Sequence, residues 1–464
     1  MSEPREHVVR LFHEVAETVP AYRMFLREHD IDPSSVRGYD DFVRLPLLDK
    51  ANYTRRYPLP QLCRSGVLSE MIAVSSGSTG EPSFWPRSAH DEQVVAARFE
   101  QIFRDAFAAR ERRTLAVVCF ALGTWVGGLF TLACCRELAA RGYLVTVVAP
   151  GNNPAEILRV VPQLAPHVDQ VVLLGYPPFL KDVIDAGRAA GVPWERYRLK
   201  LVGAGEVFSE EWRTLVCERA GIADPPRDTA SLYGTADAGV LGNETPLSIE
   251  IRRFLATEPD LARDLFGESR LPTLVQYDPF QRFFETHDGT LLFSGDAGVP
   301  LIRYHIADTG GLFEHDDLLD AVRAHGFVPG PTGPVEPFVY VFGRSHFTVS
   351  YYGANVFPEN ITVGLERPNV SRWVTGKFVL EVVEDADRNR ALQVSVELAP
   401  GLTPPAALAD DLADTIHAEL RRLNSEFAHY VPAENQRPRI VLRPHADPRD
   451  FPAGVKHRYT RPPQ

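Results

Sequence analysis

The spacing of apolar residues changes along the chain and divides it into stretches of different predicted structure. Through residues 8–19 the apolar residues recur at helical spacing, which predicts a helix that ends at Pro20. We expect a second helix over 21–29 and a third over the polar run 91–110. The N-terminal stretch is therefore predicted to be mainly helical.

Between residues 114 and 206, short apolar runs alternate with amphipathic segments. The runs TLAVVCFAL, YLVTVVAP, QVVLLG and LKLVGAGE predict strands buried on both faces, and the segments between them predict helices. This serial order predicts a parallel sheet covered by helices on both sides. Ligands of such sheets bind beyond the carboxyl ends of the strands, so the residues that follow the strands are candidates for a binding site.

After about residue 245 the pattern changes to shorter strands and turns, and from about residue 345 the chain has a small strand and helix pattern of its own. We therefore expect an α/β fold in two parts. A large N-terminal domain of mostly parallel sheet covered by helices spans residues 1–343. A small, mobile α+β lid domain spans 344–464, with the boundary next to Gly343 and Arg344.

Charge and composition narrow the classes of partner. The 464 residues include 44% hydrophobic and 24% charged residues, as in a soluble globular protein of more than one domain. The net charge of −12 argues against nucleic acid or a membrane surface as the main partner. The five cysteines form no CxxC or zinc-like spacing, and we see no signal peptide and no membrane-spanning run. These features predict a cytoplasmic protein with reduced thiols.

The run SSGSTG, Ser75 to Gly80, is the first candidate for chemistry. Its backbone N–H groups and hydroxyls could surround a phosphate, although no Walker-type lysine follows the loop. A flexible solvated linker is the alternative. Because basic residues are nearly all arginine, a required lysine has few candidates: Lys50, Lys181, Lys200, Lys377 and Lys456.

Two further motifs follow predicted strands. In SLYGTADAG, Tyr233 could stack on a base and Asp237 could hold a magnesium ion through oxygen, or the segment is an ordinary turn. In VPLIRYHIADTGG, Asp308 follows a predicted strand and precedes an expected turn, and its carboxylate could accept both hydroxyls of a ribose. Arg303, in the same motif, is either a functional residue or a structural ion-pair partner.

The order and spacing of these motifs resemble the adenylate-forming superfamily, and within it the phenylacetate–CoA ligase-like branch, over nearly the whole chain. SSGSTGEP is similar to the SSGTTGxP loop of that branch. The segments AGEVFSEEWR, YGTAD, PLIRYHIAD and GRSHFTVSYYGANVFP match further motifs in the same order. In this family the Ser/Thr/Gly loop binds the phosphates of ATP while an acyl-adenylate forms.

The resemblance implies a role for each matched residue. Asp237 would ligate Mg²⁺ where the family usually has glutamate, and Asp308 would bind the ribose hydroxyls. Tyr233 would pack on adenine. Lys456, from the mobile domain, would bridge the substrate carboxylate and the α-phosphate. Further nucleotide contacts are implied for Ser75, Ser76, Gly77, Ser78, Thr79, Gly80, Glu206, Gly234, Thr235 and Arg344.

The pocket for the acid is expected beside FALGTWVGG. Phe120 and Trp125 are its candidate walls, and Gly127 and Gly205 would leave room. Aromatic walls favour aryl or arylacetic acids. An ordinary core position for Trp125 is the alternative.

Three departures from the family pattern bear mainly on the second half-reaction. His346 and Ser350 replace the carboxylate and lysine that usually follow Gly-Arg, and Ala236 precedes the shorter carboxylate of Asp237. Gly-Val-Lys replaces Gly-Lys, which moves Lys456 by one position.

We therefore expect ATP-dependent adenylation of an aromatic carboxylic acid, with release of pyrophosphate, followed by acyl transfer to coenzyme A. ATP, Mg²⁺ and coenzyme A are the expected cofactors, and relatives suggest a homodimer. One alternative is a different acceptor, an amine, a hydroxyl or nitrite, in specialised biosynthesis. A second alternative is a non-catalytic relative that binds a nucleotide or an aryl acid.

Overall fold

The structure is a computed structural model. It describes residues 2–75, 83–124, 126–205, 207–268, 270–330, 333, 335–344, 349–351, 354–384, 390–424, 427–428, 431, 433–452, 457 and 459–460. The statements below concern these residues.

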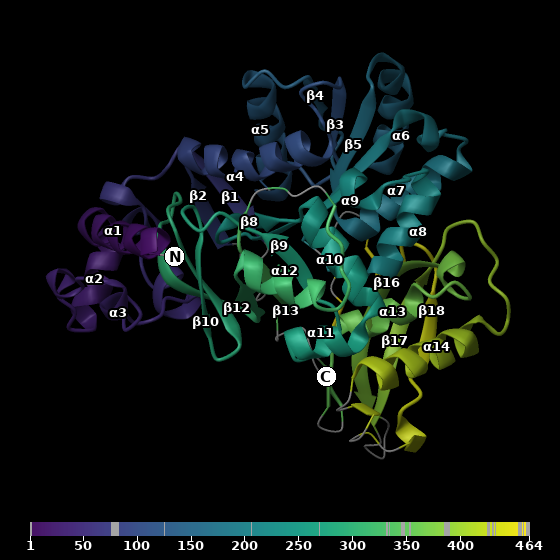
Figure 1. Cartoon of the computed structure of the whole chain (residues 1–464). Helices are drawn as coiled ribbons and strands as arrows, with labels where there is room; N and C mark the ends of the chain where they lie inside the picture. Colours follow the sequence, from purple (N-terminus) through teal and green to yellow (C-terminus); the bar gives the residue numbers. More distant parts are fainter. Residues whose placement is uncertain are drawn as a thin grey trace.

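A single large sheet of eleven strands forms the centre of the molecule (Figure 1). Its strand order is β10-β11-β12-β13-β9-β8-β7-β6-β5-β3-β4. The parallel half contains β3 (Thr114–Val118), β4 (Val145–Val148), β5 (Gln170–Gly175), β6 (Leu199–Ala204) and β7 (Thr229–Thr235).

The antiparallel half of the sheet begins where β8 (Gly239–Asn243) turns back along β7. It continues through β9 (Thr273–Gln276), β10 (Phe283–His287), β11 (Thr290–Gly295), β12 (Leu301–Phe313) and β13 (Phe338–Arg344). The sequence pattern changes near residue 245, but the sheet does not end there, because β8 pairs with both β7 and β9.

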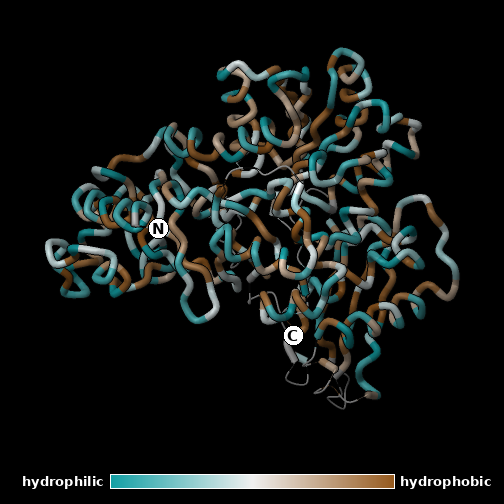
Figure 2. The backbone as a smooth tube through the Cα atoms, viewed as in Figure 1, coloured by the Kyte–Doolittle hydropathy of each residue, from teal (hydrophilic) through white to brown (hydrophobic). Residues whose placement is uncertain are grey.

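Helices cover both faces of the parallel half, as the continuous apolar strands predict. On one face α4 (Ala89–Gln101) and α5 (Val126–Ala140) pack on the even-numbered residues of β3 and β5. On the other face α6 (Pro154–Leu164), α7 (Pro177–Ala189) and α8 (Glu210–Ala220) pack on the odd-numbered residues. Figure 2 shows hydrophobic segments running along the central strands and hydrophilic segments in the outer loops.

The N-terminal helices α1 (Ser2–Thr18), α2 (Pro20–Glu28) and α3 (Tyr39–Phe42) pack against the outer antiparallel strands, at the left of Figure 1. The hairpin of β1 (Met71–Ser75) and β2 (Ser83–Arg87) follows them. Short helices α9 (Pro225–Asp228), α10 (Pro246–Thr257), α11 (Pro259–Phe266) and α12 (His315–Arg323) complete the large body.

The last part of the chain has its own core and its own sheet, at the lower right of Figure 1. A small hairpin, β14 (Val349–Tyr351) with β15 (Ala354–Val356), precedes α13 (Pro358–Leu365). The sheet is β16 (Val374–Glu384), β17 (Arg390–Leu398) and β18 (Arg439–Arg443), covered by α14 (Leu408–Leu423). The predicted α/β class with a small C-terminal sheet domain is confirmed.

Two element predictions differ in detail from the structure. The helix expected over 91–110 is α4, which ends at Gln101 and passes into a wider turn, Ile102–Ala106. The turn expected after Asp308 is absent, because β12 continues through Asp308 to Phe313 and pairs with β13. None of the described helices is long and apolar enough to cross a membrane.

Candidate active site

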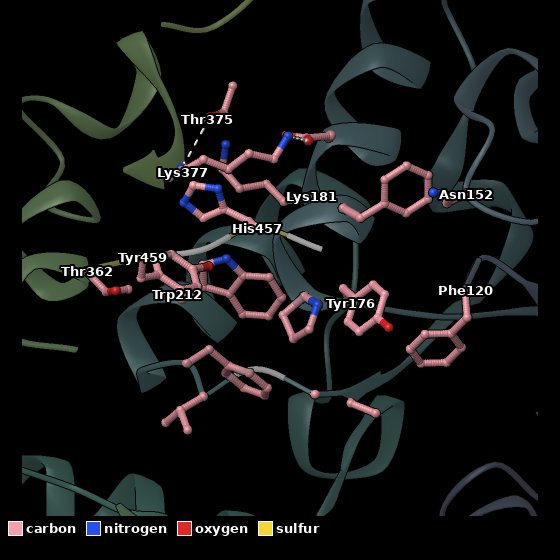
Figure 3. A pocket seen from close by; sticks show the side chains of 18 of the residues that line it. Phe120, Asn152, Tyr176, Lys181, Trp212, Thr362, Thr375, Lys377, His457 and Tyr459 are labelled. Carbon is pink, nitrogen blue, oxygen red and sulfur yellow. Dashed lines mark hydrogen bonds and ion pairs between the residues drawn. The ribbon is translucent and has the colours of Figure 1, made fainter. Parts of the chain in front are cut away.

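A cavity of about 1380 Å³ lies between the carboxyl edge of the parallel strands and the C-terminal domain. Its lining includes residues that follow β3, β5, β6 and β7, together with residues of α7, α8, α13 and β16. Figure 3 shows Phe120 and Tyr176 at one side of this space and Thr362, Lys377 and Tyr459 at the other. The cavity is at the sheet edge where the sequence predicts the ligand site.

Tyr233 and Asp308 meet in the cavity although they lie on strands far apart in the sequence. The Tyr233 hydroxyl donates a hydrogen bond of 2.7 Å to Asp308 Oδ2, and both side chains are buried. Asp308 follows Ala307, whose φ of 61° is rare for a residue with a side chain. The strand therefore bends locally at the residue before the carboxylate that faces the cavity.

Asp237 forms a second polar cluster beside this pair. Its carboxylate is buried, and the Tyr304 hydroxyl donates a 2.5 Å hydrogen bond to Asp237 Oδ2. The ammonium of Lys50 lies 3.3 Å from Asp237 Oδ1, and Lys50 also lines the cavity. No described residue donates a hydrogen bond to Oδ1, so the ion pair with Lys50 is its main polar contact.

The segment from Leu48 to Thr54, here called the strap, places Lys50 at this cluster. Leu48 pairs with Tyr304 as a short extra strand: its N–H donates to the carbonyl of Arg303, and its own carbonyl accepts from His305 N–H. Asp49 then caps the turn Lys50–Thr54. Lys50 therefore lies close to Tyr304, whose hydroxyl donates to Asp237.

Arg303, on β12 beside this segment, has structural contacts. Its guanidinium forms a buried ion pair with Glu285 at 3.1 Å and donates to the carbonyl of Leu45. Of the two interpretations left open by the sequence, the contacts fit the structural ion pair.

The hairpin of β1 and β2, whose connecting residues 76–82 lie outside the described part of the chain, contacts the Asp237 cluster through β2. Arg87, at the end of β2, is buried and donates to the carbonyls of Ala236 and Asp237. The ring of Trp85 lies 5.8 Å from the Lys50 ammonium. Both β2 and Lys50 therefore lie next to the Asp237 cluster.

The other side of the cavity is apolar. Phe120 and Tyr176 meet edge to face, with ring centroids 5.1 Å apart and planes at 87°. Gly127 and Gly205 also line this side, beside the two rings. The structure thus brings together three of the four residues predicted for the acid pocket and adds Tyr176.

The C-terminal domain closes the cavity through polar contacts with the large body. Lys377 of β16 forms an ion pair of 2.9 Å with Asp182 of α7 and one of 3.4 Å with the buried Glu397. Burial alone would lower the pKa of Lys377, but these two carboxylates raise it. The lysine therefore stays charged at the domain interface.

A second contact between the large body and the C-terminal domain is a hydrogen bond and not an ion pair. The Ser209 hydroxyl, at the start of α8, donates to Glu366 Oε2, while no described residue donates to Glu366 Oε1. Burial raises the pKa of Glu366 to about 8, and the neighbouring Glu211 adds to the rise.

His457 anchors the chain end on β16. Its Nε2–H donates a 2.5 Å hydrogen bond to the carbonyl of Phe378, and its ring packs on Tyr459. Burial lowers the pKa of His457 to about 4, so the imidazole is neutral near pH 7.

Several predicted residues lie outside what the structure describes. This holds for Ser76, Gly77, Ser78, Thr79, Gly80, Trp125, Glu206 and Lys456, for the side chains of Ser75, Arg344 and Ser350, and for His346. Of the remaining predictions, Phe120, Gly127, Gly205, Tyr233, Gly234, Thr235, Asp237 and Asp308 all line the one cavity.

Sequence reasoning gave no role to Lys50, Tyr176 or Lys377. Tyr176 carries a signal that could have found it, because it directly follows an apolar strand. Lys50 was one of only five lysines, but its partner is set by tertiary pairing that no local pattern reveals.

Comparison with known proteins supports the resemblance drawn from the motifs. A phenylacetate–coenzyme A ligase of Thermus thermophilus is 25% identical over 360 residues, which cover 77% of this chain and 73% of that protein. The phenylacetate–coenzyme A ligase of Escherichia coli is 21% identical over 362 residues, covering 74% and 71%. A scan against models of protein families found no match.

Solved structures show the same fold. A structure of 2-hydroxyisobutyryl-CoA ligase in the postadenylation state, with a bound acyl-AMP, has a TM-score of 0.67 at 16% identity, covering 99% of this chain and 87% of that one. The same ligase in the thioesterification state, with acyl-AMP and CoA, has a TM-score of 0.52 at 16% identity, covering 99% and 89%. The resemblance to adenylate-forming ligases of the phenylacetate–CoA ligase-like branch is confirmed, and with it an enzyme of the ligase type.

Proposed function

We propose that this relative of the phenylacetate–CoA ligases joins ATP and an aromatic carboxylic acid to form an acyl-adenylate and pyrophosphate, and then transfers the acyl group to coenzyme A. The observation that carries the proposal is the meeting of the Tyr233–Asp308 and Tyr304–Asp237–Lys50 clusters at one edge of an apolar cavity. The first cluster offers a carboxylate to ribose hydroxyls, and the second offers charge to phosphates.

In the first step, a carboxylate oxygen attacks the α-phosphorus and the bond to pyrophosphate breaks. The protein's task is to orient the reactants and to balance the negative charge. Lys50 lines the cavity beside Asp237 and would face the phosphates. It would supply the positive charge that the Ser/Thr/Gly loop, which has no lysine, does not. Lys456 remains the predicted cation from the C-terminal domain, next to the anchored His457.

The residues present fit a magnesium ion held largely by the substrate. Among the described residues no three His, Cys, Asp or Glu side chains come together as a metal site. Mg²⁺ commonly takes only one or two carboxylates and completes its shell with phosphates and water. Asp237 Oδ1, which accepts no hydrogen bond from a described residue, would hold it. When bound, the ion would neutralise phosphate charge.

The relative position of the two bodies suits the adenylation step. The chain is more similar overall to the 2-hydroxyisobutyryl-CoA ligase structure in the postadenylation state than to the one in the thioesterification state. The contacts of Lys377 with Asp182 and of Glu366 with Ser209 hold this arrangement. A rotation of the C-terminal domain before the second step would have to break both contacts.

The test is a product analysis of the purified protein with ATP, Mg²⁺ and a panel of aryl acids, with and without coenzyme A. Pyrophosphate and acyl-AMP from acid alone, and acyl-CoA with the thiol added, are the expected products by mass. Pyrophosphate without thioester would assign another acceptor, an amine, a hydroxyl or nitrite. No pyrophosphate with any acid would overturn the adenylation proposal.

A further inference from the structure

The turn between β7 and β8 carries Asp237 at its centre. Thr235 pairs with Gly239 where the two strands end, which leaves Ala236, Asp237 and Ala238 as the three residues of the turn. Gly239 has a φ of 74°, in the left-handed region that closes many three-residue turns. Most turns lie at the surface and offer their carbonyls to water, but Asp237 and Ala238 are each only 1% exposed. The carbonyls of this turn therefore need partners within the protein.

Each carbonyl of the turn accepts a hydrogen bond from a buried guanidinium group. Arg87, the last residue of β2, donates from Nη2 to the carbonyl of Ala236 and from Nη1 to that of Asp237, the second at 3.4 Å. Arg282, next to the start of β10, donates from Nη2 to the carbonyl of Ala238 at 3.3 Å. Two arginines that are far from the turn in the sequence thus hold its whole backbone.

The two arginines are costly to bury. Arg87 is 1% exposed and Arg282 is 3% exposed, and no described residue accepts a hydrogen bond from the Nε–H of either. Burial lowers the pKa of Arg282 to about 10 and also lowers the pKa of Arg87, although the charge of Asp91 opposes both changes. Such burial of cations opposes stability, so their presence beside Asp237 points to a task other than packing.

The backbone around the arginines is tightly packed. The N–H of Gly298 donates a 2.7 Å hydrogen bond to Asp91 Oδ2, and a Cβ on Gly298 would collide with the carbonyl oxygen of Pro86. Arg282 also donates from Nη1 to the carbonyl of Asp296 at 3.2 Å. These contacts fix the segments that carry the two guanidinium groups, and so they fix the donors that the turn receives.

The backbone of the turn determines where the Asp237 carboxylate lies. Tyr304 contacts Oδ2, and the Lys50 ammonium lies 3.3 Å from Oδ1. Mg²⁺ demands near-ideal octahedral geometry with oxygen ligands at about 2.1 Å. A carboxylate on a turn meets that demand only if the turn itself is held in one conformation.

We propose that Arg87 and Arg282 are positioning residues, whose hydrogen bonds to the three carbonyls of the turn hold Asp237 where it binds the Mg²⁺ that accompanies ATP. This inference rests on the proposed function, in which Asp237 Oδ1 holds the ion. The forked guanidinium of Arg87 reaches two successive carbonyls at once, which a single lysine ammonium does not. Neither arginine is among the described residues that line the cavity, so each acts through the turn.

The first experiment measures the Kd for ATP by calorimetry, with Mg²⁺ and with EDTA in its place. We expect Arg87→Lys and Arg282→Lys to bind ATP about tenfold more weakly with Mg²⁺ and within twofold of the wild type with EDTA. Arg252→Lys is the matched control and should bind as the wild type does. Arg252 is equally buried and donates to two carbonyls away from the turn, those of Phe208 and Pro272. Equal weakening with and without Mg²⁺, or none, would overturn the proposal.

A double variant tests whether the effect passes through Asp237. In an Asp237→Asn background, Arg87→Lys should change the Kd for ATP with Mg²⁺ by less than twofold, because the ligand that it positions is already gone. In an Asp308→Asn background the roughly tenfold effect should persist, since Tyr233 orients that carboxylate. The same factor in both backgrounds would contradict the proposed route.

Amide hydrogen exchange of the protein without ATP or acid separates this inference from the proposed function. The N–H of Ala238 donates to Thr235 Oγ1 at 3.1 Å, so its exchange reports the order of the turn. Exchange there should be faster in Arg87→Lys while β5 and β6 keep wild-type rates, a result that supports positioning even if no acid yields pyrophosphate. Unchanged exchange in the turn, an equal rise in β5 and β6, or failure of both lysine variants to fold refutes it even if adenylation is confirmed.

Discussion

Lys50 and Asp237 form an ion pair, with 3.3 Å between Nζ and Oδ1, although the two residues are far apart in the sequence. Asp237 follows a central strand, whereas Lys50 arrives on a strap that pairs beside Tyr304. The Ser/Thr/Gly loop has no lysine of its own, so we propose Lys50 as the cation that acts with it.

Replacement of Lys50 by methionine should lower the rate of adenylation by about 100-fold, which is typical for loss of one oriented group that stabilises developing charge. The measurement is pyrophosphate release at saturating acid and ATP. Lys50→Arg should recover part of the rate, because it keeps the charge. Arg55→Met is the control, since Arg55 lies exposed in the same segment. A Lys50→Met enzyme with wild-type kcat and KM for ATP would remove Lys50 from the site.

Replacement of Asp308 by asparagine should weaken ATP binding by roughly 10–100-fold, the effect of losing a hydrogen bond to a charged group. Tyr233→Phe should have a smaller effect, because it removes only the donor that orients the carboxylate. Both are measured as Kd for ATP by calorimetry, with the exposed Asp316→Asn as control. An unchanged Kd in Asp308→Asn would rule out the ribose assignment.

The parallel half of the sheet and its helices could be predicted because their signals are local. Each strand is an uninterrupted apolar run, and each helix has its own periodicity. The same reasoning placed Tyr233 and Asp237 at the ligand edge. It also applies to Tyr176, which follows β5 in the same way.

The remaining features depend on contacts between distant segments. Gly310 and Gly311 suggest a turn after Asp308, but β12 continues through them in pairing with β13, with a bulge between Thr309 and Gly310. The ion pair of Lys50 depends on where Leu48 pairs, and that of Lys377 on how the C-terminal domain docks. Neither the hydrophobic spacing nor the residue propensities around Lys50 or Lys377 specify which carboxylate each lysine pairs with.

Glu366 should make stability depend on pH in a definite direction. Its pKa in the folded protein is about 8 against an ordinary value of 4.5, mainly because burial disfavours the carboxylate. The contribution of this group to stability is therefore complete below pH 4.5 and is lost as the pH rises to about 8. We expect the free energy of unfolding of Glu366→Gln to fall less between pH 5 and 8.5 than that of the wild type.

The control for this pH effect is Glu218→Gln, which removes an exposed carboxylate from α8. Its urea unfolding curves should keep the pH dependence of the wild type. If Glu366→Gln also keeps it, the carboxyl group is ionised in the folded protein and does not penalise the interface.

Replacement of Asp182 by asparagine should affect the two half-reactions differently. Asp182 pairs with Lys377 across the domain interface, and its loss leaves Lys377 with Glu397 alone. The arrangement suited to adenylation is then less favoured, whereas rotation away from it no longer breaks this ion pair. We expect pyrophosphate release to fall several-fold while thioester formation from supplied acyl-adenylate stays within twofold. Asp185→Asn on the same helix is the control, because its partners Lys181 and Arg219 belong to the large body. An equal fall in both half-reactions would show that the ion pair does not select between the two arrangements.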